Sequence, residues 1–239
     1  MNLQKTLAIA GNDLPKECED QLRELGYEVM ILPSYHRLGK GVDTHTDLML
    51  FPIDDRVFIY KELTEALPEL CAELEKRGYT VVPVKNAPAP EYPKDIPLNC
   101  LRVGKYIICK KKHIAPEIEE YAQKQGYVTV NTNQGYARCT ACPIGDSAVI
   151  TADPSIIKTV RACGLEVLTV SEGNVILRCH SHGFIGGACG TDRDKIFFTG
   201  SLSTHPDGER IKSFCLSHFK SPISLSPHPL TDVGSIFFF

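Results

Sequence analysis

One pattern of apolar and polar positions recurs along the chain. An amphipathic, helix-like segment ends at a glycine, an aromatic residue or leucine follows, and a short apolar run comes next. Four copies are clear, at 22–32, 74–84, 122–130 and 160–170, and a fifth, degenerate copy spans 216–225. A helix that turns sharply into a strand needs a left-handed residue, which glycine adopts cheaply. The pattern therefore predicts five helix–turn–strand elements.

Each predicted helix is preceded by an apolar run that is typical of a buried strand. These runs are 7–10, 57–60, 106–109, 148–151 and 195–199. Four of them follow a further strand-like run, with turn residues in between, at 47–51, 99–103, 138–142 and around 184–185. Two strand runs separated by a short turn indicate a hairpin. The repeating unit is thus predicted to be strand, hairpin turn, strand, helix and strand, about 40–55 residues long.

The first unit lacks its leading strand, and the end of the chain carries a spare one. The run 231–239 ends in three phenylalanines, which would otherwise form an exposed apolar patch. Pairing this run with 7–10 would leave no strand edge unpaired. The sequence therefore predicts that the two ends of the chain pair and close the five units into a ring.

Composition and charge exclude some functional classes. The chain has 239 residues, a net charge of −3 and a hydrophobic fraction of 43%, ordinary values for a globular protein. Nucleic-acid binding usually requires a basic face. The one short basic run, 110–113, is interpreted as a solvated turn at the start of a helix. We therefore expect no nucleic-acid partner.

The cellular compartment is predicted from two further features. No apolar stretch reaches 18 residues, and residues 1–6 lack the apolar core of a signal peptide. These features predict a cytoplasmic protein with no membrane contact. In a reducing cytosol, the ten cysteines should be free thiols, metal ligands or redox groups, not disulfides.

Polar residues cluster where units two and five begin. Alternation along an extended segment would place Asp43, His45 and Asp47 on one face, as cation ligands and a proton carrier. His180 and His182 would share a face in the same way, within a glycine-rich stretch that allows close approach of a ligand. The alternative interpretations are a polar loop for the first cluster and a glycine-rich hairpin for the second.

The remaining units each add a polar candidate. Unit four contains Arg138 and the pair Cys139 and Cys142, a spacing typical of redox or zinc sites but also of buried structural thiols. Unit three offers Asn99 and Arg102, and the closing strand offers Asp232. If the ring forms, one polar group from each unit faces one channel, which suits a small ligand: Asp47, Asn99, Arg138 or Cys139, His182 and Asp232.

Five such units around a pseudo-fivefold axis resemble the pentein fold, the α/β propeller of the guanidino-group-modifying enzymes. That superfamily includes arginine deiminase, agmatine deiminase, dimethylarginine dimethylaminohydrolase and glycine amidinotransferase. The chain also looks similar to ribosome anti-association factor 6, a pentein without catalysis, and to uncharacterised bacterial proteins of this fold. The resemblance covers the whole chain as topology and implies one domain over residues 1–239, with a site on a central channel.

The resemblance also implies roles for residues. Such hydrolases use a carboxylate to grip the guanidinium, a histidine as acid and base, and a cysteine nucleophile on the last strand. The matching stretch of this chain, 234–238, has phenylalanine in place of that cysteine. Cys189 or Cys139 could substitute from a neighbouring strand.

Three hypotheses follow. The first is an enzyme that acts on a guanidino or amidine C–N bond of a small amino-acid-like substrate, without a cofactor. His182 or His45 would carry protons, Asp43 or Asp47 would grip the cation, and Cys189 or Cys139 would be the nucleophile. The second is a non-catalytic pentein that binds a small ligand or a protein. The third is a zinc protein with ligands drawn from Cys139, Cys142, His180 or His182, and Cys189.

Overall fold

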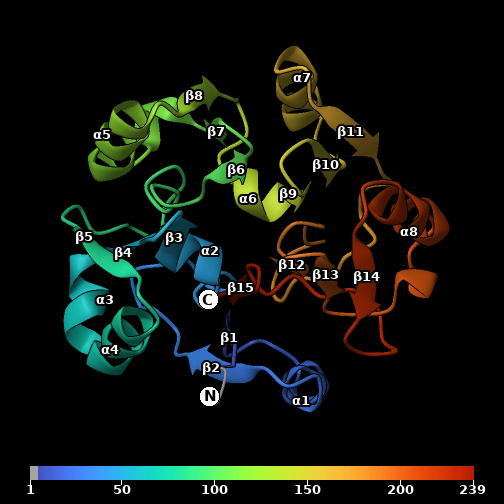
Figure 1. The fold of residues 1–239 in the computed structure, drawn as a ribbon, viewed down its shortest axis with the longest axis horizontal. Helices are drawn as coiled ribbons and strands as arrows, with labels where there is room; N and C mark the ends of the chain where they lie inside the picture. Colours follow the sequence, from blue (N-terminus) through green and yellow to red (C-terminus); the bar gives the residue numbers. More distant parts are fainter. Residues whose placement is uncertain (1–4) are drawn as a thin grey trace.

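The strands of the molecule form five separate three-stranded sheets. The computed structural model describes residues 5–239, and in this part of the chain the sheets are arranged around a common centre (Figure 1). In chain order they are β15-β1-β2, β3-β4-β5, β6-β7-β8, β9-β10-β11 and β12-β13-β14. Within each sheet, the first pair of strands is antiparallel and the second pair is parallel.

The strand bounds follow the predicted units closely. The first two sheets contain β1 (Leu7–Gly11), β2 (Glu28–Leu32), β3 (Leu50–Ile53), β4 (Arg56–Tyr60), β5 (Thr80–Val84) and, from the chain's end, β15 (Phe237–Phe238). The other three contain β6 (Leu101–Val103), β7 (Tyr106–Cys109), β8 (Val128–Asn131), β9 (Ala141–Ile144), β10 (Ala148–Thr151), β11 (Glu166–Thr169), β12 (Cys189–Asp192), β13 (Lys195–Phe198) and β14 (Ser221–Ser224).

Helices link the second and third strands of every sheet and lie on the outside of the molecule (Figure 1). They are α1 (Lys16–Glu24), α3 (Lys61–Ala66) with α4 (Pro68–Lys76), α5 (Pro116–Gln125), α7 (Pro154–Ala162) and α8 (Gly208–Ser217). Gly126 ends α5 with a φ of 79°, the left-handed turn that the sequence pattern predicts. In the degenerate fifth copy this place is taken by Phe219, which has a φ of 57° and is 91% exposed.

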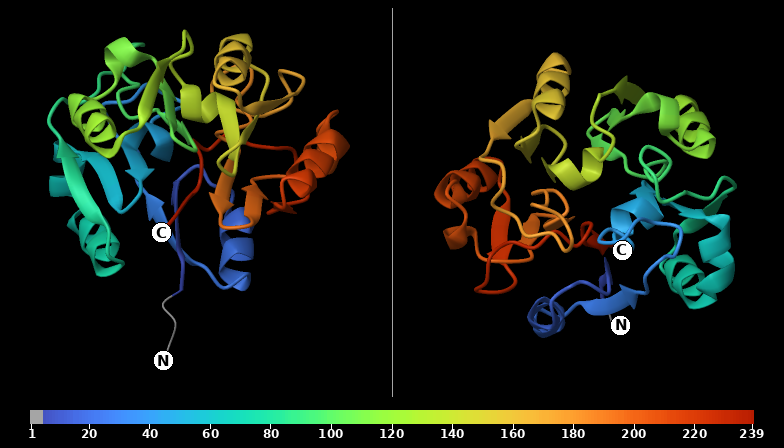
Figure 2. Two further views of the ribbon diagram at one scale, coloured as in Figure 1. Left: turned by 45° about the horizontal axis from the view of Figure 1, so that its top comes forward. Right: turned by 180° about the vertical axis from the view of Figure 1, so that it is seen from behind.

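The two ends of the described chain pair with each other, as the sequence predicts. Strand β15 runs antiparallel to β1, with Ala8 opposite Phe238 and Ile9 opposite Phe237. Backbone bonds of 2.8 Å in both directions join Leu7 to Phe239 beyond the paired residues. Figure 2 shows the last strand beside the first one. The predicted strand over 231–239 is shorter than expected, because only Phe237–Phe238 pairs as a strand.

Three of the predicted leading strands are also wrong in part. The run 47–51 begins as the short helix α2 (Thr46–Met49), and 138–142 begins as α6 (Ala137–Thr140). The third run, around 184–185, is not a strand, and β12 starts only at Cys189. A short apolar run does not reveal its period, so contacts with other parts of the chain decide its conformation.

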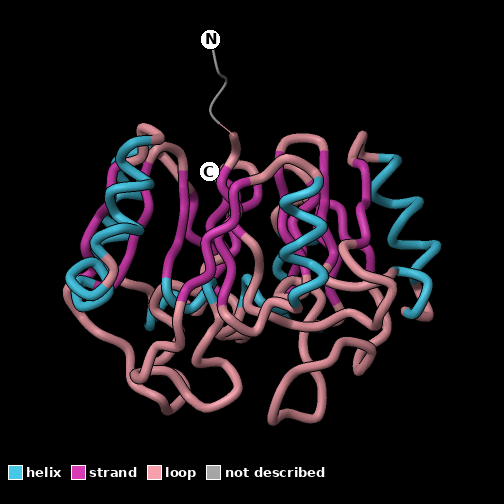
Figure 3. Tube along the Cα trace, turned by 90° about the horizontal axis from the view of Figure 1, so that it is seen from below, coloured by secondary structure: helices cyan, strands magenta, loops and turns pink. Residues whose placement is uncertain are grey.

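The remaining short elements lie in the connections. The basic run contains the 3₁₀ helix η1 (Lys111–His113) directly before α5, which confirms the interpretation of this run as a turn at the start of a helix. A second 3₁₀ helix, η2 (Leu202–Thr204), precedes α8. Long loops gather at the end of the strands opposite the described termini (Figure 3).

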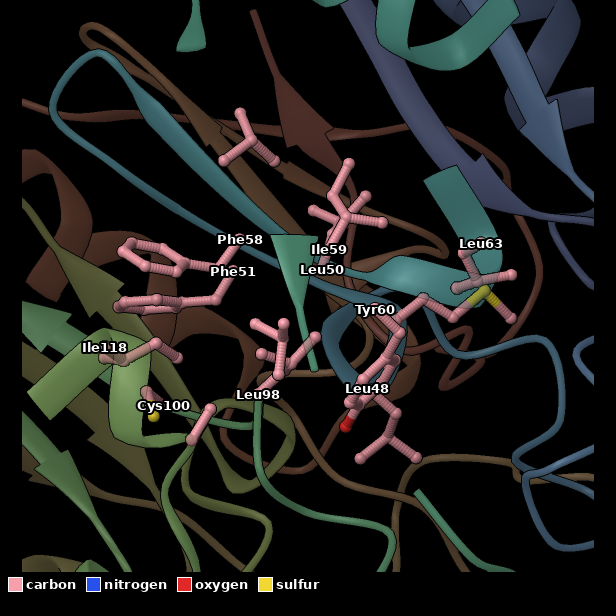
Figure 4. Packing of buried hydrophobic residues seen from close by; sticks show 14 of the residues in the cluster. Leu48, Leu50, Phe51, Phe58, Ile59, Tyr60, Leu63, Leu98, Cys100 and Ile118 are labelled. Atoms are coloured by element: carbon pink, nitrogen blue, oxygen red, sulfur yellow. The ribbon is translucent and has the colours of Figure 1, made fainter. Parts of the chain in front are cut away.

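The core lies between the sheets and the helices outside them. Phe51 and Phe58 face each other across β3 and β4, with ring centroids 6.3 Å apart, and Leu98 and Cys100 pack nearby (Figure 4). The strand in the middle of each sheet is almost wholly buried, which explains its continuous apolar run. Among residues 5–239, no helix is long and apolar enough to cross a membrane.

Candidate functional site

Polar side chains from four distant parts of the chain meet near the centre of the five sheets. We call this cluster the hub and define it by residues that are each 2% exposed or less: His45, Asp47, Asn99, Cys139, Asp232 and Ser235. Burying polar groups costs free energy unless they are paired. The hub is therefore held together by a dense network of hydrogen bonds.

Helix α2 brings His45 and Asp47 to the hub. The Thr46 hydroxyl donates to the backbone oxygens of Gly234 and Ser235, both at 2.7 Å. The Asp47 backbone N–H donates to the Gly234 oxygen at 2.9 Å. These bonds join the start of the second unit to the segment just before β15, so the pairing of the chain's ends also assembles the hub.

Cys139 and Asp47 form the centre of the network. The Cys139 thiol lies 3.0 Å from both carboxylate oxygens of Asp47. Burial, together with the charge of Asp47, raises the pKa of this thiol well above its ordinary value, so the thiol is protonated. The Asn99 amide donates to the Cys139 sulfur at 3.2 Å, and the Ser235 hydroxyl donates to Asp47 at 2.8 Å. The thiol, the carboxylate and two further donors thus share one buried space.

His45 lies beside this pair with unused hydrogen-bonding capacity. Within the described residues, neither ring nitrogen has a hydrogen-bond partner, although the side chain is only 2% exposed. Burial lowers the pKa of the imidazole, which is therefore neutral at pH 7. One ring nitrogen, the Asp47 carboxylate and the Cys139 sulfur all lie within 4.8 Å of one another. A neutral buried imidazole with free nitrogens can accept a proton or bind a metal ion.

Asp232 supplies a second buried carboxylate. It accepts the backbone N–H groups of Phe184 at 2.9 Å and Gly234 at 3.0 Å, and one oxygen is 3.7 Å from the His45 ring. Burial raises the pKa of Asp232 to about 6, although the two N–H groups oppose the shift. Gly187 packs directly against this carboxylate and leaves no room for a side chain. The glycines of unit five thus allow the backbone to approach Asp232.

Arg138 and Cys189 form a second buried group next to the hub. The Arg138 guanidinium donates to the backbone oxygen of Gly186 at 2.9 Å and lies 3.8 Å from the Cys189 sulfur. Burial raises the pKa of Cys189, but a hydrogen bond from Cys142 and the charge of Arg138 outweigh it and leave the pKa lowered. All ten cysteines lie in the described residues and all are free.

The structure separates several residues that the sequence analysis grouped. Residues 41–44 form a turn rather than an extended segment, and Asp43 pairs with Arg178 at 2.9 Å. Asp43, His45 and Asp47 therefore do not share one extended face, because His45 and Asp47 are positioned by the start of α2.

His180 and His182 also do not lie on one strand face, since residues 178–179 form a turn and residues 180–181 a bend. His180 is exposed, and the His182 ring is 3.1 Å from Glu172. Arg102 is 41% exposed and pairs with Asp146 at the hairpin end of its sheet. The predicted zinc ligands divide as well, because Cys139 faces Asp47 while Cys142 faces Cys189.

Ser235 is the hub residue that the sequence analysis did not single out. It has a φ of 73°, and its hydroxyl donates to both Asp47 and the Gly186 oxygen. A hydroxyl directly after a glycine, in an otherwise apolar terminal run, is the signal that could have indicated it.

Comparison with known structures identifies the fold. A structure titled as a dimethylarginine dimethylaminohydrolase adduct with 4-chloro-2-hydroxymethylpyridine matches with a TM-score of 0.59 at 10% identity, over 99% of this chain and 100% of that one. The amidinotransferase SxtG from Microseira wollei, of the saxitoxin biosynthetic pathway, matches with a TM-score of 0.54 at 12% identity, over 88% and 74%. The N-terminal domain of ArgZ, an arginine dihydrolase from cyanobacteria, matches with a TM-score of 0.50 at 11% identity, over 92% and 90%.

These three proteins belong to the pentein superfamily, and the chain shares their fold. At 10–12% identity the similarity establishes the fold and not the activity. A comparison with curated proteins found no match. The family model described as "Family of unknown function (DUF6873)" matches residues 9–237, almost the whole chain. The chain therefore has the pentein fold and belongs to this family of unknown function.

Proposed function

We propose that the chain is an enzyme that acts on a guanidino or amidine C–N bond of a small, amino-acid-like cation. The five sheets would be the blades of one closed α/β propeller around the hub. In this proposal Cys139 is the nucleophile, His45 carries protons, and Asp47 and Asp232 hold the cationic group. The observation that carries the proposal is the Cys139 thiol at 3.0 Å from the Asp47 carboxylate, with an unpartnered His45 ring nitrogen within 4.8 Å.

The charges of the hub favour a cationic guest. Asp47 and Asp232 are both buried, and within residues 5–239 neither forms an ion pair with a lysine or arginine. Burial raises the pKa of both carboxyl groups. A guanidinium group carries a delocalised positive charge and several N–H donors that match carboxylate oxygens. Binding of such a group would therefore offset the cost of burying the two carboxylates.

The same guest would activate the thiol. A positive charge beside Cys139 lowers the pKa of its thiol, because it stabilises the thiolate. His45 would take the thiol proton, and the sulfur would add to the central carbon of the guanidino group. The C–N bond would then break as His45 returns the proton to the leaving nitrogen, leaving an S–C amidine intermediate. Water that gives a proton to His45 would attack this carbon, the S–C bond would break, and the thiol would be restored.

Substrate entry requires movement of the loops that cover the hub, since its side chains are at most 2% exposed. Two of these loops are joined by the pair Arg178–Asp43, at 2.9 Å, and both residues are accessible from outside. Asp43 and His180 stay candidates for contacts with an entering ligand, and His182 stays a candidate only if its loop moves inward.

The test of the nucleophile is covalent labelling with 2-chloroacetamidine, which carries an amidinium charge, compared with the neutral 2-chloroacetamide. In both cases a thiolate displaces chloride and forms an S–C bond, and peptide mass mapping locates the product. We expect the amidine to label Cys139 much faster than the amide does, while the exposed Cys179 shows no such preference. Asp47→Asn should abolish the preference at Cys139. Equal rates for the two reagents at Cys139, or preferred labelling of Cys189, would overturn the assignment.

Turnover is then measured as release of ammonia or amine from arginine, methylated arginines and agmatine. Cys139→Ser should abolish release, and Cys163→Ser, at a half-buried thiol outside the hub, is the matched control. Selective labelling of Cys139 with no turnover of any of these compounds would instead favour a pentein that binds a cationic ligand without converting it.

A second candidate function is metal binding at the hub, and one observation favours it specifically. His45, Asp47 and Cys139 offer a nitrogen, an oxygen and a sulfur within 4.8 Å of one another, and the imidazole nitrogens have no hydrogen-bond partner among residues 5–239. Nitrogen, oxygen and thiolate ligands suit Zn²⁺. This set differs from the four ligands predicted from sequence, because the structure brings in His45 and Asp47 and leaves out Cys142, His182 and Cys189.

Metal analysis of the purified chain tests this function. We expect about one zinc per chain if the hub is a zinc site, and His45→Ala should remove the metal. Substitution with Co²⁺ should give a thiolate-to-metal charge-transfer band that is absent in Cys139→Ser. A metal content below one tenth of an equivalent, with no such band after cobalt addition, would eliminate the metal site.

A further inference from the structure

A second polar region lies at the other end of the sheets. A cavity of about 350 Å³ opens among the hairpin turns and is lined by five cationic residues: Arg102, Arg138, Arg193, Lys195 and Lys220. The hub residues lie in segments that precede the first strand of a sheet, such as α2 and α6. Most residues of the cavity lining instead lie near the end of the first strand of a sheet. We call this cavity the basic pocket. It lies on the same central region as the hub but faces the opposite way.

The charge of the basic pocket contrasts with that of the whole chain. Asp146 is the one acidic residue in its lining, while the whole chain has a net charge of −3. Asp146 is exposed and lies 3.5 Å from Arg102, so this pair sits at the rim. Like charges gathered in one concave site produce a local potential that attracts the opposite charge.

The other four cations have no carboxylate partner within residues 5–239. Lys220 donates to the backbone oxygen of Arg193, and the Lys195 ammonium lies 5.8 Å from the centre of the Tyr27 ring. The nearby Asp192 accepts the Tyr27 hydroxyl at 2.8 Å and does not line the pocket. The cations thus keep donors free for a guest.

Among the five cationic residues, Arg138 would be stabilised most by a bound anion. Its side chain is nearly buried, is held by backbone oxygens and lies over the Phe237 ring at 5.7 Å. The Cys189 thiol at 3.8 Å is its acidic neighbour, and no carboxylate within residues 5–239 forms an ion pair with it. A buried guanidinium without a carboxylate or phosphate partner is costly. An anion in the basic pocket would offset this cost, because Arg138 lines the pocket.

We propose that the basic pocket binds a small polyphosphate anion. Arginine and lysine together are the usual ligands of phosphate oxygens, and the cavity volume is at the small end of ligand sites. Phe237 and Phe238, which are half-buried, add apolar walls against which the ring of a phosphate ester can pack. The shared chemistry is a diphosphate group, carried by inorganic pyrophosphate or by a nucleoside diphosphate. This site is independent of the reaction proposed at the hub.

Isothermal titration calorimetry of the full chain with pyrophosphate and with ADP tests the proposal. We expect saturable binding of one anion per chain that weakens as ionic strength rises, because the contacts are charged. Tighter binding of ADP than of pyrophosphate would indicate that the aromatic walls contact the nucleobase. Tighter binding of pyrophosphate would indicate that the pocket binds the inorganic anion. The Cys139→Ser variant should bind both anions as the native chain does. The result at the basic pocket therefore does not depend on whether the reaction proposed at the hub takes place.

Charge reversal locates the site. The double variant Arg193→Glu with Lys195→Glu should weaken binding at least about tenfold, which corresponds to about 1.4 kcal/mol. Lys158→Glu, the same kind of change on an exposed position of α7, is the control and should bind as the native chain does. No heat of binding with either anion at millimolar concentration, or equal weakening by the control, would overturn the proposal.

Discussion

Replacing Gly234 with alanine tests how tightly the closing segment of the chain packs against α2. Gly234 has a φ of 70°, and a Cβ there would overlap the backbone and Cβ of His45. Its backbone oxygen accepts hydrogen bonds from the Thr46 hydroxyl and the Asp47 N–H. An alanine must therefore push the segment away from α2 and break both bonds. We expect a loss of about 1 kcal/mol for the backbone conformation and about 1 kcal/mol for each bond, roughly 3 kcal/mol together.

Gly126→Ala is the matched control for this prediction. Gly126 has a similar φ of 79°, but a Cβ there would meet nothing within 4 Å. Only the conformational cost of about 1 kcal/mol should remain at this position. Urea unfolding followed by far-UV circular dichroism gives both free energies of unfolding. If the two variants lose the same stability, the contact between the closing segment and His45 does not stabilise the protein, and the description of the hub fails.

Two further predictions concern the closing strand and acid stability. Phe238→Ala removes a ring stacked on Phe197 at 5.0 Å and should lower the free energy of unfolding by about 2–3 kcal/mol. Phe219→Ala, at a side chain that is 91% exposed, is the control and should cost almost nothing. Equal urea midpoints for the two variants would contradict this prediction. The Ser171 N–H and Arg210 lower the pKa of Asp207 to about 2, and His205 lies beside it. Asp207 should therefore contribute up to about 2.5 kcal/mol to the free energy of unfolding at neutral pH. Because the folded pKa is below the unfolded one, this stability is lost as pH falls from about 4 to 2, and Asp207→Asn should flatten the unfolding free energy over that range.

The sequence predicts the five sheets and the helices that connect their strands well, because its signals are local. A glycine at the end of an amphipathic helix requires a left-handed turn wherever it occurs, and a buried central strand needs a continuous apolar run. The pairing of the ends was predictable for a related reason. The first unit lacked a strand, and the terminal run Phe237–Phe239 offered an apolar strand with nowhere else to pack.

The directions of side chains were less predictable. The alternation rule applies only to extended chain, and α2 and α6 take the place of the first part of two expected strands, where polar candidates lie. Helix α2 is held by bonds to Gly234 and Ser235, which are 188 and 189 residues away in the sequence, and no local pattern of residues 43–51 reveals these bonds. Asp43 was therefore grouped with Asp47, although it pairs with Arg178.

The position of the thiol follows from the architecture of the hub. The last strand has Phe237 and Phe238 where a nucleophilic cysteine was expected, and the residue before them that faces Asp47 is Ser235, an alcohol. The five sheets place equivalent segments around one centre, so a thiol can reach the same carboxylate from another sheet if it precedes that sheet's first strand. Cys139 satisfies this condition at α6, while Cys189 begins β12 and faces Cys142 and Arg138 instead. Chemistry at Asp47 should therefore depend on Cys139 and tolerate the loss of Cys189, which the labelling experiment can distinguish.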